Sequence, residues 1–220
     1  SRVFFVRAEL LDASGDVVAY RTDAGAVFAG RLSAGPAAPI DVPAAAAVAA
    51  ASSGVVFSYS ASAGTVSRID LASGRVAAAD KVAATVERPV LTAAGDDWVL
   101  LDTAGSGAGR FWTSRGTGTI SLTGTIAVSR PAVDGDAVYV ADDTGLVRIP
   151  VSAVAAERIF GDSTTSRGTP ARPVSRGGVI SAAWLAEGTR GGTLWTSTGG
   201  DVPLDYGGQG LGSQRRPVFV

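Results

Sequence analysis

The sequence predicts an all-β fold, and three signals that recur about every 40 residues support this prediction. The first is Arg-Pro followed by a small apolar residue. The second is an alternating apolar segment that follows a glycine, and the third is another such segment after a second glycine. Alternation is typical of half-buried strands, whereas a helix would repeat its apolar residues three and four positions apart. A period of this length with three or four short strands is typical of a β-propeller blade.

The stretch from Arg130 to Val151 shows the repeat most clearly. It contains Arg-Pro, a turn at Asp134-Gly135, a strand over 137–141, a second turn over 142–145 and a second strand over 146–151. Two apolar runs separated by such a turn predict a β-hairpin, because glycine adopts the positive φ that the turn requires. Equivalent glycines before the first strand of this pair are Gly15, Gly54, Gly95, Gly135 and Gly177.

The repeats predict about five four-stranded blades in a single propeller over residues 1–220. Their boundaries fall roughly at 1–43, 44–87, 88–129, 130–171 and 172–215. Residues 216–220 begin the repeat again, so this segment either closes the ring against the first blade or starts another blade of a larger ring of six to eight. Both ends of the sequence lie within a repeat, which favours the larger ring. Open strand edges would then favour self-association.

The alanine-rich tract Pro43–Ala51 has two interpretations. By itself, this run has the highest helix propensity in the chain. Its position in the repeat, however, is that of the innermost strand of a blade, where small residues suit a crowded centre. We therefore expect a strand, with a helix as the alternative.

Composition excludes several kinds of chemistry. The net charge of −1 gives no electrostatic reason to expect nucleic acid or an anionic membrane surface as a partner. Cys, Met and His are absent, which removes thiolate nucleophiles, disulfides, Cys or His zinc sites and the Ser-His-Asp triad. No apolar run reaches the length of about 18 residues that a bilayer-spanning helix needs, so we expect no direct membrane insertion of this segment. The sequence predicts no cofactor and no metal site.

The four arginines of the Arg-Pro pairs are the candidate ligand-binding residues. The repeat would place equivalent residues at one end of a central channel, where their guanidinium groups could hold an anion or an acidic loop of a partner. Alternatively, each arginine pairs with an aspartate or a backbone carbonyl of the adjacent blade. The four residues are Arg88, Arg130, Arg172 and Arg216.

Carboxylates cluster in the fourth repeat at Asp134, Asp136, Asp142 and Asp143, with counterparts one repeat earlier at Asp96, Asp97 and Asp102. Oxygen ligands of this kind can bind calcium, but the spacing does not match an EF-hand loop. Aspartate beside glycine is typical of tight turns, which is the interpretation we favour. The few glutamates do not pair with aspartates at matching repeat positions, so the two acids of a glycosidase are not indicated. We find no catalytic residues.

The four tryptophans lie on or at the ends of predicted strands. These positions predict packing between blades in preference to a ligand platform. The glycines follow the blade period and do not form a phosphate-binding loop between a strand and a helix. The tryptophans are Trp98, Trp112, Trp184 and Trp195.

Two resemblances follow from these segments. The segment RPAVDGDAVYVADDTGLVRIPV resembles the residue pattern of blades in pyrroloquinoline-quinone-like propellers. Together with DDWVLLDTAG and GGVISAAWLAEGTRGGTLW, it resembles the N-terminal propeller region of large actinobacterial proteins that carry Ig-like or fibronectin type III repeats. The latter resemblance implies an extracellular or cell-surface protein, tethered to the membrane by segments outside this chain. That family has no catalytic motif whose residues could be assigned to positions of this sequence.

The function we expect is therefore that of a non-catalytic interaction or scaffold module that binds a protein or polysaccharide partner through one face. The alternatives are a secreted propeller enzyme, similar to a glycoside hydrolase or a quinone-dependent dehydrogenase, and the extracellular sensor domain of a receptor. Converging polar side chains at a channel mouth would favour an enzyme, whereas small apolar groups there would favour a scaffold.

Overall fold

The computed structural model describes residues 8–34, 40–42, 45–77, 79–82, 85–103, 107–122, 131–152, 155–162, 164–186 and 191–205. Within these ranges the regular structure consists of strands and one short 3₁₀ helix, η1 (Leu32–Ala34). The strands form five sheets, which confirms the all-β fold and the number of sheets expected from the repeats. The chain divides into an N-terminal unit, residues 1–102 with 112–114, and a C-terminal unit, residues 103–111 with 115–220.

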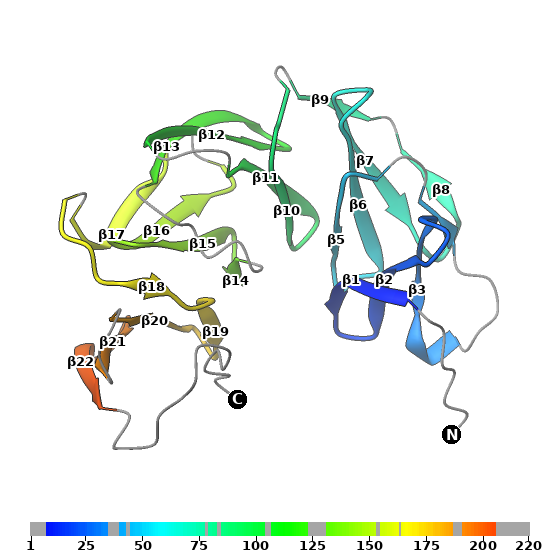
Figure 1. The fold of residues 1–220 in the computed structure, drawn as a ribbon. Coiled ribbons are helices and arrows are strands. Elements are labelled where there is room, and N and C mark those ends of the chain that lie inside the picture. Colours follow the sequence, from blue (N-terminus) through cyan, green and yellow to red (C-terminus); the bar gives the residue numbers. More distant parts are fainter. Residues whose placement is uncertain are drawn as a thin grey trace. The chain divides into compact units, whose positions relative to one another are not determined.

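Two sheets of the N-terminal unit are built from strands that are consecutive in the sequence and antiparallel (Figure 1). The first has the order β1 (Ala8–Ser14), β2 (Val17–Thr22), β3 (Val27–Arg31) and β4 (Ile40–Asp41). The second has the order β5 (Ala47–Ala50), β6 (Val55–Ser60), β7 (Thr65–Asp70) and β8 (Arg75–Val76), and β9 (Asp80–Lys81) also pairs with β7.

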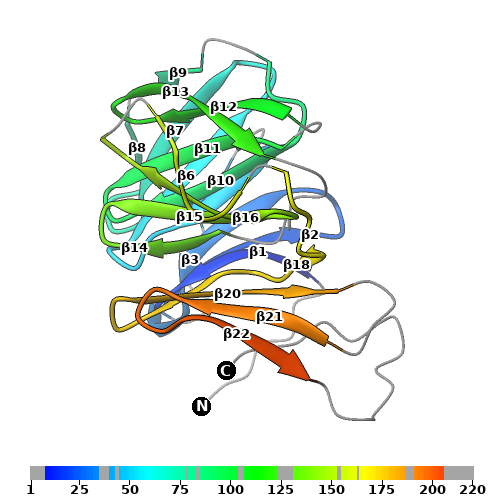
Figure 2. The same cartoon turned by 90° about the vertical axis from the view of Figure 1, so that its left-hand side faces the viewer.

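The other three sheets follow the same rule, with one departure. The third sheet contains strands on both sides of the division, in the order β10 (Pro89–Ala94), β11 (Asp97–Asp102), β12 (Gly107–Thr113) and β13 (Gly116–Leu122). The fourth contains β14 (Ala132–Asp134), β15 (Ala137–Asp142), β16 (Gly145–Pro150) and β17 (Glu157–Gly161). The fifth contains β18 (Thr169–Pro170), β20 (Val179–Leu185), β21 (Gly191–Thr196) and β22 (Gly200–Asp205), and β19 (Val174–Arg176) also pairs with β20. Figure 2 shows β20, β21 and β22 side by side.

The alanine-rich tract forms a strand where the structure describes it. Residues Ala47–Ala50 are β5, which pairs with β6 and begins the second sheet. Ala49 belongs to one apolar cluster, and Val48 and Ala50 belong to another. Burial of both faces against neighbouring residues therefore decides the conformation of this tract, and outweighs its intrinsic preference for helix. The predicted strand is confirmed.

Buried residues join neighbouring sheets within each unit. In the N-terminal unit, Phe57 and Tyr59 of β6 pack in a cluster with residues of β10 and β11, while Val56 between them packs in a cluster with residues of β2 and β3. Successive side chains of a strand point to opposite faces, so β6 is buried on both sides. In the C-terminal unit, one cluster joins β15 to β20. These apolar layers hold the polar turns in place.

Glycines close the turns as the sequence predicts. All five glycines that precede the repeated strand have positive φ, between 57° and 96°: Gly15, Gly54, Gly95, Gly135 and Gly177. Gly145 of β16 and Gly161 of β17 pair with each other, and glycine is required there because the two backbones lie very close together. A Cβ on Gly145 would lie 2.0 Å from the carbonyl oxygen of Phe160, and one on Gly161 would lie 2.0 Å from that of Thr144. Only glycine permits this close approach of the two backbones.

Candidate functional site

The four predicted arginines do not form a described site. Arg130 and Arg216 lie outside the residues that the structure describes. Arg88 and Arg172 are both exposed and lie in different units. The backbone N–H of Arg88 donates to Oδ1 of Asp102 at 3.2 Å, which anchors the start of β10 to the end of β11. A ring of the four guanidinium groups therefore stays a prediction.

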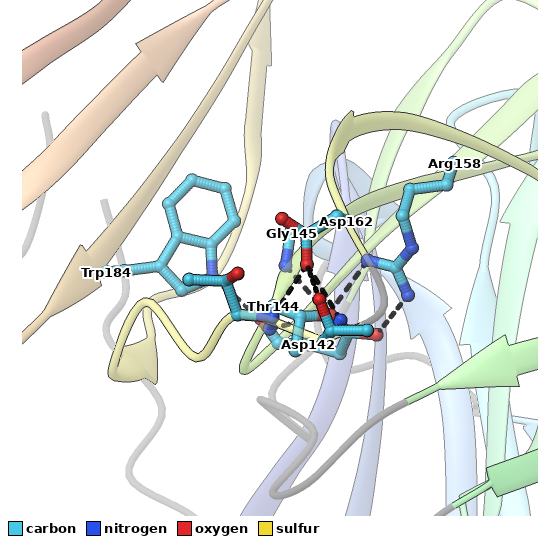
Figure 3. A network of polar contacts seen from close by, with 8 residues as sticks. Asp142, Thr144, Gly145, Arg158, Asp162 and Trp184 are labelled. Carbon is cyan, nitrogen blue, oxygen red and sulfur yellow. Dashed lines mark hydrogen bonds and ion pairs between the residues drawn. The ribbon is translucent and has the colours of Figure 1, made fainter.

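The densest polar network lies instead at the turn between β15 and β16 (Figure 3). Oδ1 of Asp142 accepts hydrogen bonds from the backbone N–H of Thr144 at 2.9 Å, from its hydroxyl at 2.9 Å and from the N–H of Gly145 at 2.8 Å. An aspartate that binds backbone N–H groups two and three residues further on is typical of a tight turn. The interpretation of Asp142 as a turn residue is confirmed.

The same carboxylate forms a two-point ion pair with Arg158 on β17. Nη2 of Arg158 lies 2.6 Å from Oδ2 of Asp142, and Nη1 lies 3.1 Å from Oδ1 (Figure 3). The Asp142 side chain is fully buried and that of Arg158 is 17% exposed. Fixed donors thus occupy both oxygens of the carboxylate. This arrangement locks the turn to the outer strand of its sheet and leaves the carboxylate poorly placed to accept a proton from a substrate.

Trp184 of β20 connects this turn to the next sheet. Its indole N–H donates to the backbone carbonyl oxygen of Asp142 at 2.7 Å, and its side chain is fully buried. Trp98 makes a comparable contact in the N-terminal unit, where its N–H lies 3.1 Å from Oδ2 of Asp80. Trp112 is also buried, and Trp195 is half-buried against Phe160. The predicted packing between sheets is confirmed for Trp98, Trp112 and Trp184, which are buried in the apolar clusters.

Hydrogen bonds between adjacent sheets repeat the period of the sequence. The Ser53 hydroxyl donates to Asp96 across 43 residues, and the Ser175 hydroxyl donates to Asp134 across 41 residues. The N–H of Ala50 donates to Oδ2 of Asp12 across 38 residues. Asp96 and Asp134 belong to the predicted acidic clusters, and in the structure they join neighbouring sheets rather than their own turns.

Two other arginines, Arg31 and Arg68, join neighbouring sheets. Nη2 of Arg31 donates to the carbonyl oxygen of Ser53 at 3.0 Å, while Nη1 lies 2.7 Å from Oδ1 of Asp16. Arg68 lies 3.5 Å from Asp96 in the following sheet. Neither residue shows a periodic signal in the sequence. An arginine at the end of a strand, one strand away from the Gly15-Asp16 turn, is the available clue for Arg31.

Three aspartates have lowered pKa values because turn donors stabilise their ionised form. The Thr164 hydroxyl, followed by the backbone N–H groups of Thr164 and Thr165, lowers the pKa of Asp162 far below its usual value. At Asp70, the N–H and hydroxyl of Ser73 lower the pKa. The pKa of Asp16 is lowered first by the Ser33 hydroxyl and then by Arg31. All three carboxylates therefore serve local structure.

In the part of the chain that the structure describes, no group of three or more acidic residues is arranged to hold a metal ion. Over the same residues, no helix has the length and apolar character needed to cross a membrane.

The comparisons with known proteins identify the fold as that of β-propellers. Streptogramin B lyase is similar with a TM-score of 0.56 and 15% identity over 90% of this chain and 68% of that one. AztD from Citrobacter koseri gives a TM-score of 0.58 and 14% identity over 90% of this chain and 61% of that one. The propeller domain of the Trilobed protease from Pyrococcus furiosus gives 0.56 and 11%, over 93% and 71%.

These similarities establish the fold alone, because the identities are low. The chain spans between 61% and 71% of the length of these three structures. No protein-family model matches the sequence, and no curated protein matches it. These three structures are different proteins, so the shared fold alone does not indicate an activity for this chain.

Proposed function

We propose that this chain is a non-catalytic interaction module of an exported or cell-surface bacterial protein, and that it binds a protein or polysaccharide partner through one propeller face. The observation that supports this proposal is the use of the described carboxylates. The carboxylates of Asp142, Asp162 and Asp70 accept hydrogen bonds within turns, and those of Asp96 and Asp134 join neighbouring sheets. Acids committed to such contacts are poorly suited to proton transfer.

The proposed setting rests on the resemblance to actinobacterial proteins with fibronectin type III repeats. The bias toward alanine, glycine, valine and arginine is typical of GC-rich genomes and agrees with this source. In such a protein the propeller would be presented outside the cell, with the anchor and the repeats supplied by other segments. Protein and polysaccharide ligands are both available in that setting.

A binding assay with a parallel test for turnover examines this proposal. The full chain is incubated with insoluble polysaccharides and with actinobacterial cell-wall preparations, and the bound fraction is measured after sedimentation. The soluble fraction is assayed for released reducing sugar, and a dye-linked dehydrogenase assay is run with added pyrroloquinoline quinone. We expect retention without turnover. Release of sugar or dye reduction above the level of heat-denatured protein would contradict the proposal and favour a propeller enzyme.

A further inference from the structure

Arg167 lies in the segment between β17 and β18 and is held firmly at its backbone. Its N–H donates to the carbonyl oxygen of Asp143 at 2.7 Å. The next residue, Gly168, has a φ of +103°, and a Cβ there would lie 2.1 Å from the carbonyl oxygen of Leu185. This segment is therefore packed closely against β20 and the turn that follows β15. The backbone at Arg167 and Gly168 is therefore held by contacts on both sides.

No ion pair of the Arg167 guanidinium group is found among the described residues, although the carbonyl oxygen of an acidic residue, Asp143, accepts the Arg167 N–H. Its Cζ atom lies 4.2 Å from the centroid of the Phe160 ring, and its Nε is buried without a hydrogen-bond partner. Arg158, on the neighbouring strand β17, has instead a two-point ion pair with Asp142. A buried donor on a cation raises the free energy of the folded state unless it has an acceptor. A negatively charged acceptor forms the strongest hydrogen bond with such a donor. The buried Nε cannot itself reach a ligand, so the donors that Arg167 offers are those of Nη1 and Nη2, which have no hydrogen-bond partner among the described residues.

The Phe160 ring packs against this cation, and two further aromatic rings pack against Phe160. The Phe160 ring stacks on that of Trp195, with centroids 5.4 Å apart and planes at 28°, and also lies 5.3 Å from that of Trp184. Phe160 and Trp195 are half-buried, so part of this aromatic surface reaches solvent, whereas Trp184 is fully buried. The nearby acid Asp162 has its Oδ1 engaged by Thr164 and Thr165. The arrangement combines a cation with an apolar ring surface.

We propose that Arg167, Phe160 and Trp195 bind a carboxylate-bearing sugar unit of an acidic polysaccharide. This inference rests on the proposed function and specifies its ligand. The guanidinium fork matches a carboxylate in geometry and charge. The C–H face of a pyranose ring suits dispersion contact with an indole face. An acidic protein segment would supply the charge but no rigid ring, so the aromatic neighbours favour the sugar.

The test uses trigalacturonic acid and the neutral trisaccharide maltotriose. Each is titrated into the full chain, and binding is followed by calorimetry and by tryptophan fluorescence. Arg167→Gln is compared with Arg176→Gln, which removes the same charge from an exposed position on β19. We expect the wild-type chain and Arg176→Gln to bind the acidic trisaccharide equally, and Arg167→Gln to bind it at least about tenfold more weakly. Trp195→Phe should also weaken binding, and added salt should reduce it.

Several outcomes would overturn the inference. These are equal binding of maltotriose, equal binding by Arg167→Gln, and absence of any binding by the wild-type chain. Hexaglutamate binding as tightly as trigalacturonic acid would instead assign the site to an acidic protein segment. Thermal denaturation confirms that each variant is folded. Retention on polysaccharide that does not depend on Arg167 would refute this site and leave the proposed function standing. Absence of wild-type retention on every polysaccharide and every cell-wall preparation would refute both.

Discussion

The indole N–H of Trp184 donates to the backbone carbonyl oxygen of Asp142, a residue 42 positions earlier in the sequence, at 2.7 Å. The carboxylate of the same aspartate binds the turn that follows it and Arg158. One residue therefore joins a turn, an outer strand and the next sheet. The first two predictions concern this junction.

Trp184→Phe keeps an aromatic ring but removes the N–H donor. The buried carbonyl oxygen of Asp142 then loses this hydrogen bond, and we expect the free energy of unfolding to fall by about 2 kcal/mol. Urea denaturation followed by circular dichroism measures the change. Trp195→Phe is the control, because this half-buried residue makes no indole hydrogen bond to the described residues. Equal losses in the two variants would show that the Trp184 hydrogen bond contributes nothing.

Asp142→Asn should destabilise the fold strongly. The amide supplies one acceptor where two charged oxygens bind Arg158, and it presents its NH₂ group to existing donors. We expect a loss of about 3 kcal/mol, because breaking one partner of a buried pair leaves the other charge uncompensated. Arg148→Gln is the control, since its ion pairs at 3.8 and 3.9 Å are exposed. It should cost less than about 1 kcal/mol, and the reverse order of the two losses would contradict this account.

Tyr59→Phe should leave stability unchanged or raise it by up to about 1 kcal/mol, because a buried hydroxyl without a partner pays a desolvation cost. The Tyr59 side chain is fully buried, and its hydroxyl has no hydrogen-bond partner among the described residues. The midpoint of urea denaturation measures the effect. Tyr20→Phe, at a partly exposed position, controls for the loss of a hydroxyl in general. A marked destabilisation by Tyr59→Phe would show that this hydroxyl is satisfied in solution.

Gly54→Ala should cost more than Gly95→Ala. Both glycines have positive φ, but a Cβ at Gly54 would lie 2.0 Å from Nη2 of Arg31, while one at Gly95 would contact nothing within 4 Å. Relief of this clash moves Arg31 away from Ser53 and Asp16. We expect Gly95→Ala to cost about 1 kcal/mol from backbone strain and Gly54→Ala about 1 kcal/mol more. In an Arg31→Ala background the difference should disappear, and a double-mutant cycle by urea denaturation checks this.

Asp162→Asn should reduce the loss of stability on acidification. The folded state lowers the pKa of Asp162 relative to the ordinary value of 3.8, so the unfolded state binds a proton more readily. The contribution of this carboxylate is present above pH 3.8 and is lost as the pH falls below it. Thermal denaturation between about pH 2.5 and pH 6, which covers the upper part of this loss, measures the slope. Thr164→Val, which removes the main donor, should flatten the acid limb in the same direction, and an unchanged slope in both variants would refute the assignment.

Much of the architecture follows from local signals in the sequence. Strand alternation and glycine turns depend on residues that are close together in the chain, as at Gly135 between β14 and β15, so they can be predicted from one sequence. The strand Ala47–Ala50 required the repeat period as well, because its composition alone favours a helix. Burial on both faces settles that conflict.

The candidate site was harder to predict because it depends on register between sheets. The Arg-Pro pairs draw attention by their spacing, whereas Arg31 and Arg68, which contact a following sheet, have no such spacing. Likewise, Arg167 is notable only because Phe160 and the turn at Asp143 meet it in space. No pattern of neighbouring residues predicts contacts between side chains that are far apart in the sequence. The fifth sheet shows the same limit, since two short strands, β18 and β19, both pair with β20.

The hydrogen bonds that span 38 to 43 residues have a consequence for biosynthesis. Each of these hydrogen bonds joins one sheet to the sheet that follows it in the sequence. In a nascent chain, a sheet can therefore pack against its neighbour as soon as that neighbour has left the ribosome. Within each unit, assembly from the N-terminus would then proceed one sheet after another.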